Sequence, residues 1–84
     1  MSVYVDDYFA PFSRMQMSHL IADSHDELLS FIDRVGVQRK WIQKQGTHQE
    51  HFDVCKSKRL LAIDAGAIQL TPKQLVVKMR EKLK

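Results

Sequence analysis

The sequence predicts one small α/β domain over residues 1–84, with a mixed or parallel sheet of about four short strands and three helices. Three observations predict this fold class. The length suits one core and leaves no room for a second. Hydrophobic residues make up 44% and charged residues 27% of the chain, which is the usual mixture of a folded soluble protein. Strand and helix signals alternate, and this order favours strand–helix–strand units with right-handed crossovers.

The elements are expected in the order strand, strand, helix, strand, helix, strand, helix. Short apolar or alternating runs bounded by turn residues indicate the strands. Residues 8–17 show no clean period and are interpreted as a long connection. The expected strands cover residues 3–5, 19–22, 37–43 and 67–70, and the expected helices run over 24–35, from near 57 to 65, and from 71 toward the end of the chain.

The helices are predicted mainly from their ends. Ser24 begins a capping box that Glu27 completes, and the following Gly36 can adopt the left-handed conformation that closes a helix. Ser57 is expected to cap the second helix. Thr71 is expected to cap the last helix, because a proline follows it in the first turn and a glutamine stands three residues on.

Cysteine usage and the absence of a leader predict a cytoplasmic protein without a membrane partner. No apolar run approaches the roughly 20 residues that span a bilayer, and the N-terminus has neither a basic leader nor a long apolar stretch. The single Cys55 cannot form an internal disulfide, which suits a reducing compartment. Nearby Lys56 and Lys58 could make Cys55 a reactive thiol; the alternative is burial as a small hydrophobe.

Charge is distributed unevenly along the chain. Residues 1–33 hold six acidic residues against one arginine, a net of −5, whereas residues 34–84 hold twelve lysines and arginines against four acidic residues, a net of +8. A basic face of this kind could attract nucleic acid or another polyanion. The alternative is that the acidic segment pairs with the basic one within the fold or across a dimer.

Several short blocks of the sequence resemble one known family. The blocks are Val3-Tyr4-Val5-Asp6, Arg14 with residues 17–23, Asp26-Glu27-Leu28, residues 39–43, His51-Phe52-Asp53, Ser57-Lys58-Arg59 and Gly66-Ala67. Their order and spacing resemble the small bacterial and phage domain-of-unknown-function family 4031 through about Leu70, with departures at residues 9–12 and at Ile42. That family has no established activity. The resemblance therefore implies only a set of polar residues: Asp6, Arg14, Ser18, His19, Asp23, Arg39, Trp41, Gln43, His51, Asp53, Lys58 and Arg59.

The leading functional hypothesis is binding of a phosphate-bearing ligand, either a nucleotide or a nucleic-acid backbone. Basic residues in the first turn of the second helix oppose its dipole unless an anion is bound there. Guanidinium groups bind phosphate through two parallel hydrogen bonds, and a tryptophan among basic residues suits stacking on a base. In the alternative interpretation the cations are solvated or ion-paired and the tryptophan is in the core. The expected ligand-binding residues are Arg14, Arg39, Trp41, Ser57, Lys58 and Arg59.

A second hypothesis is a small phosphoester hydrolase or nuclease. Acidic and imidazole side chains are expected near strand ends, where open α/β sheets bind ligands. They could hold a divalent metal that activates water, or act as acid and base without one. No metal ligand is predicted, because His48 and His51 lack the spacing of the helical zinc signature and one cysteine excludes a finger. His19 could instead be a core histidine. If the chain is an enzyme, the catalytic candidates are Asp6, His19, Asp23, His51 and Asp53, and the cofactor is left unspecified.

A third hypothesis is a phage or bacterial protein–protein interaction module. It requires an exposed apolar patch, for which the candidates are Phe9, Phe12, Met15 and Met17. Across the three hypotheses the expected partner is a nucleotide, a nucleic acid or a protein, and the sequence leaves open whether the chain forms a homo-oligomer.

Overall fold

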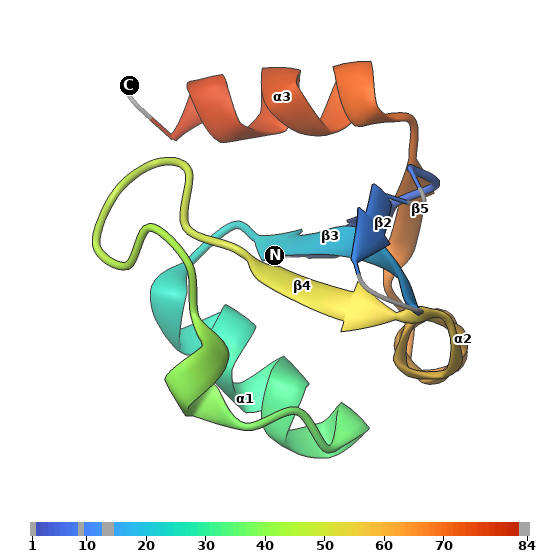
Figure 1. Cartoon of the computed structure of the whole chain (residues 1–84). Helices are drawn as coiled ribbons and strands as arrows, with labels where there is room; N and C mark the ends of the chain where they lie inside the picture. Colours follow the sequence, from blue (N-terminus) through green and yellow to red (C-terminus); the bar gives the residue numbers. More distant parts are fainter. Residues whose placement is uncertain (1, 9, 13–14, 83–84) are drawn as a thin grey trace.

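A computed structural model describes residues 2–8, 10–12 and 15–82 of the chain, without the side chains of residues 10–12 and 15. Within these residues, strands and helices follow one another as in Figure 1. The elements are β1 (Val3–Asp6), β2 (Ala10–Phe12), β3 (Met15–Ala22), α1 (His25–Val35), the 3₁₀ turn η1 (Arg39–Trp41), β4 (Phe52–Cys55), α2 (Lys56–Asp64), β5 (Ile68–Leu70) and α3 (Pro72–Glu81).

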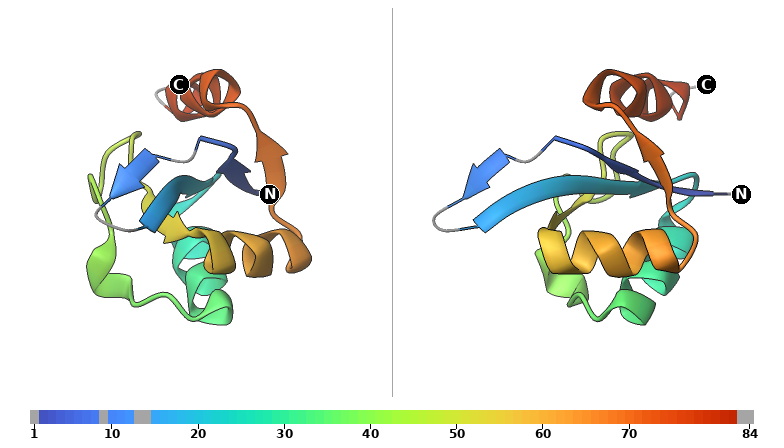
Figure 2. Two further views of the ribbon diagram at one scale, coloured as in Figure 1. Left: turned by 45° about the vertical axis from the view of Figure 1, so that its right-hand side comes forward. Right: turned by 90° about the vertical axis from the view of Figure 1, so that its right-hand side faces the viewer.

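The sheet is mixed, and β3 is its central strand. Leu20 of β3 lies opposite Val5 of β1 and also opposite Phe52 of β4, so β1 and β4 occupy the two edges of β3. β2 pairs antiparallel with the start of β3, and both extend beyond the helices (Figure 2). β5 pairs parallel with β1. The predicted α/β class, with three helices and a mixed sheet, is confirmed, and the sheet also contains the short strand β2.

Helices cover both faces of the sheet. α1 and α2 pack on one face, and α3 lies across the other (Figure 1). Alternate strand residues point to opposite faces. Val5, Leu20, Phe52 and Val54 therefore join the main core with α1 and α2, while Tyr4 and Ile21 pack against Leu75 of α3. The same alternation places Asp6, His19 and Asp53 on the face of the sheet that α3 covers.

The predicted helix ends are confirmed at α1 and α3. The Ser24 hydroxyl accepts the backbone N–H of Glu27, and Gly36 closes α1 with a φ of 80°. A reciprocal capping box joins Thr71 and Gln74 at the start of α3. No helix in the described part of the chain is long and apolar enough to cross a membrane.

Three local predictions are wrong. The strand expected at residues 37–43 is absent: residues 39–41 form the η1 turn, and Trp41 is 59% exposed, so it is not a core residue. The strand before α2 is β4, because Phe52 and Val54 are the alternating residues that bury their side chains. Ser57 does not cap α2, which begins at Lys56 after Cys55. Residues 8–17, expected to be one long connection, contain β2 and the first residues of β3, which begins at Met15 and not at residue 19.

Candidate functional site

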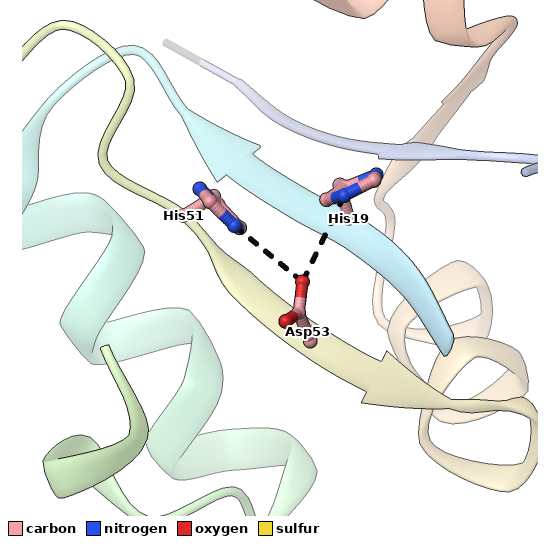
Figure 3. A group of neighbouring side chains, drawn as sticks. All are labelled: His19, His51 and Asp53. Carbon is pink, nitrogen blue, oxygen red and sulfur yellow. Dashed lines mark ion pairs between the residues drawn. The ribbon is translucent and has the colours of Figure 1, made fainter. Parts of the chain in front are cut away.

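Two imidazoles and two carboxylates gather on the face of the sheet that α3 covers. Figure 3 shows His19, His51 and Asp53 pointing toward one another from β3 and β4. His19 lies directly opposite Asp53 in the strand register, and His51 precedes Asp53 by two residues on the same face. Nε2 of His51 is 3.4 Å and Nε2 of His19 is 3.9 Å from Oδ1 of Asp53. With Asp6, which contacts His19, these residues are called the His–Asp cluster below.

An interruption in the sheet places Asp6 beside His19. The last pair between β3 and β1 is Leu20–Val5, and the next pair, between β3 and β2, is Met17–Ala10, so the two pairs are three residues apart on β3 but five residues apart in the partner numbering. Extra residues of this kind bend a strand and redirect its side chains, and they are common next to active sites. Here Oδ1 of Asp6 accepts the backbone N–H of His19 at 2.9 Å, so a side chain supplies a hydrogen bond where the ladder is interrupted.

Hydrogen bonds fix which nitrogen of each imidazole is available. Nδ1 of His19 lies 2.7 Å from Oδ2 of the fully buried Asp6, and Nδ1 of His51 lies 2.8 Å from the carbonyl oxygen of Gln49. A carbonyl or carboxylate oxygen only accepts, so each Nδ1 carries the hydrogen and each neutral ring offers the lone pair of Nε2. The hydrogen bond to Asp6 raises the pKa of His19, against the opposing effect of burial.

The three converging atoms could hold a metal ion. Ligand atoms of His19, His51 and Asp53 all lie within 4.8 Å of one another, and the three side chains are partly exposed. Two imidazoles and one carboxylate form a ligand set known from catalytic zinc and non-haem iron sites. The ring of Tyr8 stacks on that of His19 at a centroid distance of 6.2 Å. Asp6, whose side chain is buried, orients His19 and does not itself reach solvent.

A cavity of about 290 Å³ opens beside the His–Asp cluster, between the sheet and α3. One side of it is polar and the other is apolar. The polar side consists of Asp6, His19, Lys44, Gln49 and His51, and the apolar side consists of Pro72, Leu75, Val76 and Met79. The cluster therefore lies at the wall of a space large enough for a small ligand.

Asp23, the fifth catalytic candidate, lies apart from this cluster. Its carboxylate accepts the backbone N–H of Ser2 at 2.8 Å and lies 3.4 Å from the hydroxyl of Tyr4, at the start of α1. The core-histidine interpretation of His19 is wrong, since its side chain is 32% exposed. The structure thus brings together four of the five candidates.

The residues predicted to bind phosphate do not form one site. Arg59 is buried and donates from Nε to the carbonyl oxygen of Asp6 and from Nη2 to Oε1 of Gln69, which ties α2 to β1 and β5. Arg39 is exposed and donates to both carboxylate oxygens of Asp33, at 3.1 and 2.7 Å, and this contact lowers the pKa of Asp33. Arg14 lies outside the described residues.

The other predicted binding residues are spread over separate surfaces. The indole of Trp41 lies 5.1 Å from Nζ of Lys40, on the 3₁₀ turn beside α1. Lys58 lies near Gly36 at the end of α1. The patch expected from Phe9, Phe12, Met15 and Met17 falls largely outside the described side chains; among these four, only Met17 has a described side chain, and it is half-buried.

Sequence reasoning missed the surroundings of the cluster. The sequence did not assign Tyr8 to the cluster, nor Lys44, Gln49 and the apolar residues of α3 to the cavity, because these residues come from a connection, a loop and a helix without a common spacing. The sequence did contain one signal for the geometry of the cluster itself. His51 and Asp53 flank an apolar residue at the period of a strand, and that alternation indicates a shared polar face.

Cys55 is half-buried at the start of α2 and has a thiol of altered acidity. Its Sγ lies 3.3 Å from the hydroxyl of Ser57, and this hydrogen bond lowers the thiol pKa despite the opposing effect of burial. We expect alkylation by iodoacetamide to reach half its maximal rate at a lower pH than for a free cysteine. Ser57→Ala should move this midpoint to higher pH, and Ser30→Ala, on α1, is the control. An unchanged midpoint in Ser57→Ala would contradict this assignment.

Comparison with known proteins identifies one family, whose description assigns no activity. The family model described as "Protein of unknown function (DUF4031)" matches residues 3–82 of the chain. No curated protein and no solved structure matches the chain.

Proposed function

The chain belongs to the DUF4031 family, whose description assigns no activity, and we propose from its site that it is a metal-dependent hydrolase of phosphoesters. The supporting observation is the convergence of Nε2 of His19 and Nε2 of His51 on Oδ1 of Asp53, beside a cavity that both histidines line. Three protein ligands that leave a coordination position open are typical of catalytic zinc sites, whereas structural zinc sites are closed by four.

The distances suit a small divalent ion. Zinc–ligand bonds of about 2.0–2.1 Å in tetrahedral geometry separate the ligand atoms by roughly 3.4 Å. The His51–Asp53 separation is already 3.4 Å, and the His19–Asp53 separation of 3.9 Å needs only a small approach. Because the Nδ1 partners already hold both rings, little conformational freedom is lost when the ion binds.

Each residue of the cluster has a distinct task. A bound zinc ion would lower the pKa of its water to about 7 and so supply a nucleophile for phosphorus. His19, His51 and Asp53 would hold the ion, while Asp6 and the Gln49 carbonyl orient the two imidazoles. In the overall reaction water adds to phosphorus, the ester P–O bond breaks, and the leaving alcohol takes up a proton.

This proposal keeps the phosphate-bearing ligand of the sequence hypothesis but assigns it to a different place. Arg39, which the sequence predicted to bind phosphate, donates its hydrogen bonds to Asp33. Arg59 donates its hydrogen bonds to Asp6 and Gln69. Lys44, in contrast, lines the cavity beside both histidines and supplies positive charge for a phosphate. We propose that the reaction takes place in the cytoplasm, in keeping with the single cysteine.

The test combines metal loading with turnover. The protein is stripped with EDTA, dialysed, and titrated with Zn²⁺, Co²⁺, Mn²⁺ and Mg²⁺ by calorimetry, and each form is assayed with p-nitrophenyl phosphate and bis(p-nitrophenyl) phosphate. We expect one transition-metal ion per chain and ester hydrolysis that EDTA abolishes and the metal restores. Absence of binding at micromolar metal, or a loaded protein that hydrolyses neither ester, would overturn the proposal.

Asp6→Asn should lower the affinity for Zn²⁺ by about 10–100-fold, the usual effect of losing a partner that orients a ligand. The asparagine carbonyl can still accept the N–H of His19, but its amide nitrogen donates, so Nδ1 of the ring must become the acceptor. The proton then moves to Nε2, the atom needed for the metal. Asp7→Asn, at the exposed neighbouring position, is the control, and equal affinities in the two variants would refute the role of Asp6.

A further inference from the structure

We propose that the cavity beside the His–Asp cluster binds the organic group of a small phosphate monoester, so that the substrate is a small molecule and not a nucleic-acid strand. The position of the phosphate in this inference rests on the proposed function. The position of the organic group rests on the cavity itself.

The two sides of the cavity differ in chemistry. Its sheet side carries the imidazoles of His19 and His51, while its α3 side is formed by Pro72, Leu75, Val76 and Met79. Leu75 is buried in contact with the sheet, but Val76 is 44% exposed, so α3 presents apolar surface to the cavity. An apolar group between the sheet and α3 would remove that surface from water, and this transfer is favourable.

The cation on the sheet side of the cavity is Lys44. Among the described residues that line this cavity, Lys44 is the one lysine or arginine. Among the described residues other than glycine, Lys44 is also the one with a positive φ, which is 55°. A backbone held in this sparsely populated region is found preferentially at ligand and active sites. A phosphate between Lys44 and the cluster would leave the organic group pointing along α3.

Size and charge distribution favour a monoester over a polymer. A volume of about 290 Å³ lies at the lower end of the roughly 300–1,000 Å³ of small-molecule sites, which limits the organic group to a ring or two. A single strand of nucleic acid needs cations along several successive phosphates, together with aromatic rings for its bases. Arg39 and Trp41 lie on the η1 turn beside α1, across the sheet from α3, so they cannot extend this cavity into a groove (Figure 1).

Two phosphonates that resist hydrolysis separate the contributions of the anion and the organic group. Dissociation constants of phenylphosphonate and methylphosphonate are measured by NMR titration of the zinc-loaded and the metal-free protein. We expect phenylphosphonate to bind about tenfold more tightly, because the ring buries apolar surface of α3. Val76→Asn should reduce that preference by about threefold and leave the affinity for methylphosphonate unchanged.

Val77→Asn is the matched control, since Val77 is exposed on the same helix but lines a different hollow with Leu70 and Gln74. It should leave both dissociation constants unchanged. Equal binding of the two phosphonates, or equal effects of the two valine variants, would overturn the inference. So would a short single-stranded oligonucleotide that binds more tightly than phenylphosphonate.

The outcomes also separate this inference from the proposed function. A preference for phenylphosphonate that depends on Val76, without turnover of any ester, would support the cavity and refute the hydrolase. Turnover of both esters without such a preference would support the hydrolase and refute the cavity.

Discussion

His51→Ala is expected to lower the affinity of the protein for Zn²⁺ by more than about 100-fold, because loss of a ligand exceeds the effect of losing a residue that only orients one. The remaining His19 and Asp53 lie 3.9 Å apart and leave the ion with two protein ligands. The fold should persist, since His51 precedes β4 and the backbone bridge between residues 43 and 51 does not depend on the side chain. The measurement is competition with a chelator of known affinity, followed by far-UV circular dichroism.

His48→Ala is the matched control for this variant. His48 is also half-buried and lies three residues earlier, but it lines a separate hollow with His25 and Glu50. Its replacement should leave the zinc affinity within about twofold, well below the 10–100-fold effects of residues that support a metal site. If the two alanine variants lose zinc affinity equally, the metal is not held by the His–Asp cluster.

Phe52→Ala is expected to reduce the free energy of unfolding by about 3–5 kcal/mol, the usual effect of truncating a buried aromatic residue. Phe52 is fully buried in the core under α1 and α2, between the cluster residues His51 and Asp53 in the sequence. Because small domains have about 5–15 kcal/mol of stability, this variant should be close to unfolding at room temperature. Urea denaturation followed by circular dichroism measures the change.

Leu60→Ala provides the comparison for Phe52→Ala. Leu60 is 54% exposed on α2, so its truncation should change the free energy of unfolding by no more than about 0.5 kcal/mol. A loss for Phe52→Ala below about 1 kcal/mol would contradict the placement of this ring in the core.

The fold was predictable where the signal is local. The capping residues Ser24 and Thr71 and the terminating Gly36 act within one helical turn, and the structure has α1 and α3 at the expected places. The strand expected at residues 37–43 failed because Trp41 suggested burial that the tertiary structure does not provide, and only Ile42 of this segment's large apolar pair packs against the core. Exposure of a side chain depends on what packs over it, and local propensity does not contain that information.

The site was predictable in its residue types but not in its geometry. Asp6, His19, His51 and Asp53 were named because they combine acid and imidazole groups near expected strand ends. The convergence of His19, His51 and Asp53 could not be read from the sequence, because these residues come from β3, from the position before β4 and from β4, and they meet only through the register that sets His19 opposite Asp53. Arg59 is the converse case, a residue that the sequence suggested for ligand binding but that has a structural role. Its contacts with Asp6 and Gln69 depend on packing of α2 against two strands, and no sequence spacing distinguishes it from a ligand-binding arginine.

In the proposed site, the residues that would hold the ion and the residues that would contact the organic group belong to different elements. The atoms proposed to hold the ion belong to β3, β4 and the residue before β4, whereas the apolar wall of the cavity belongs to a helix joined to the sheet by one short strand. Side chains of α3 that face the cavity can therefore be exchanged without moving a ligand atom. Under the proposed function, the preference for one substrate over another could be redesigned, or could diverge between related proteins, through changes in α3 alone.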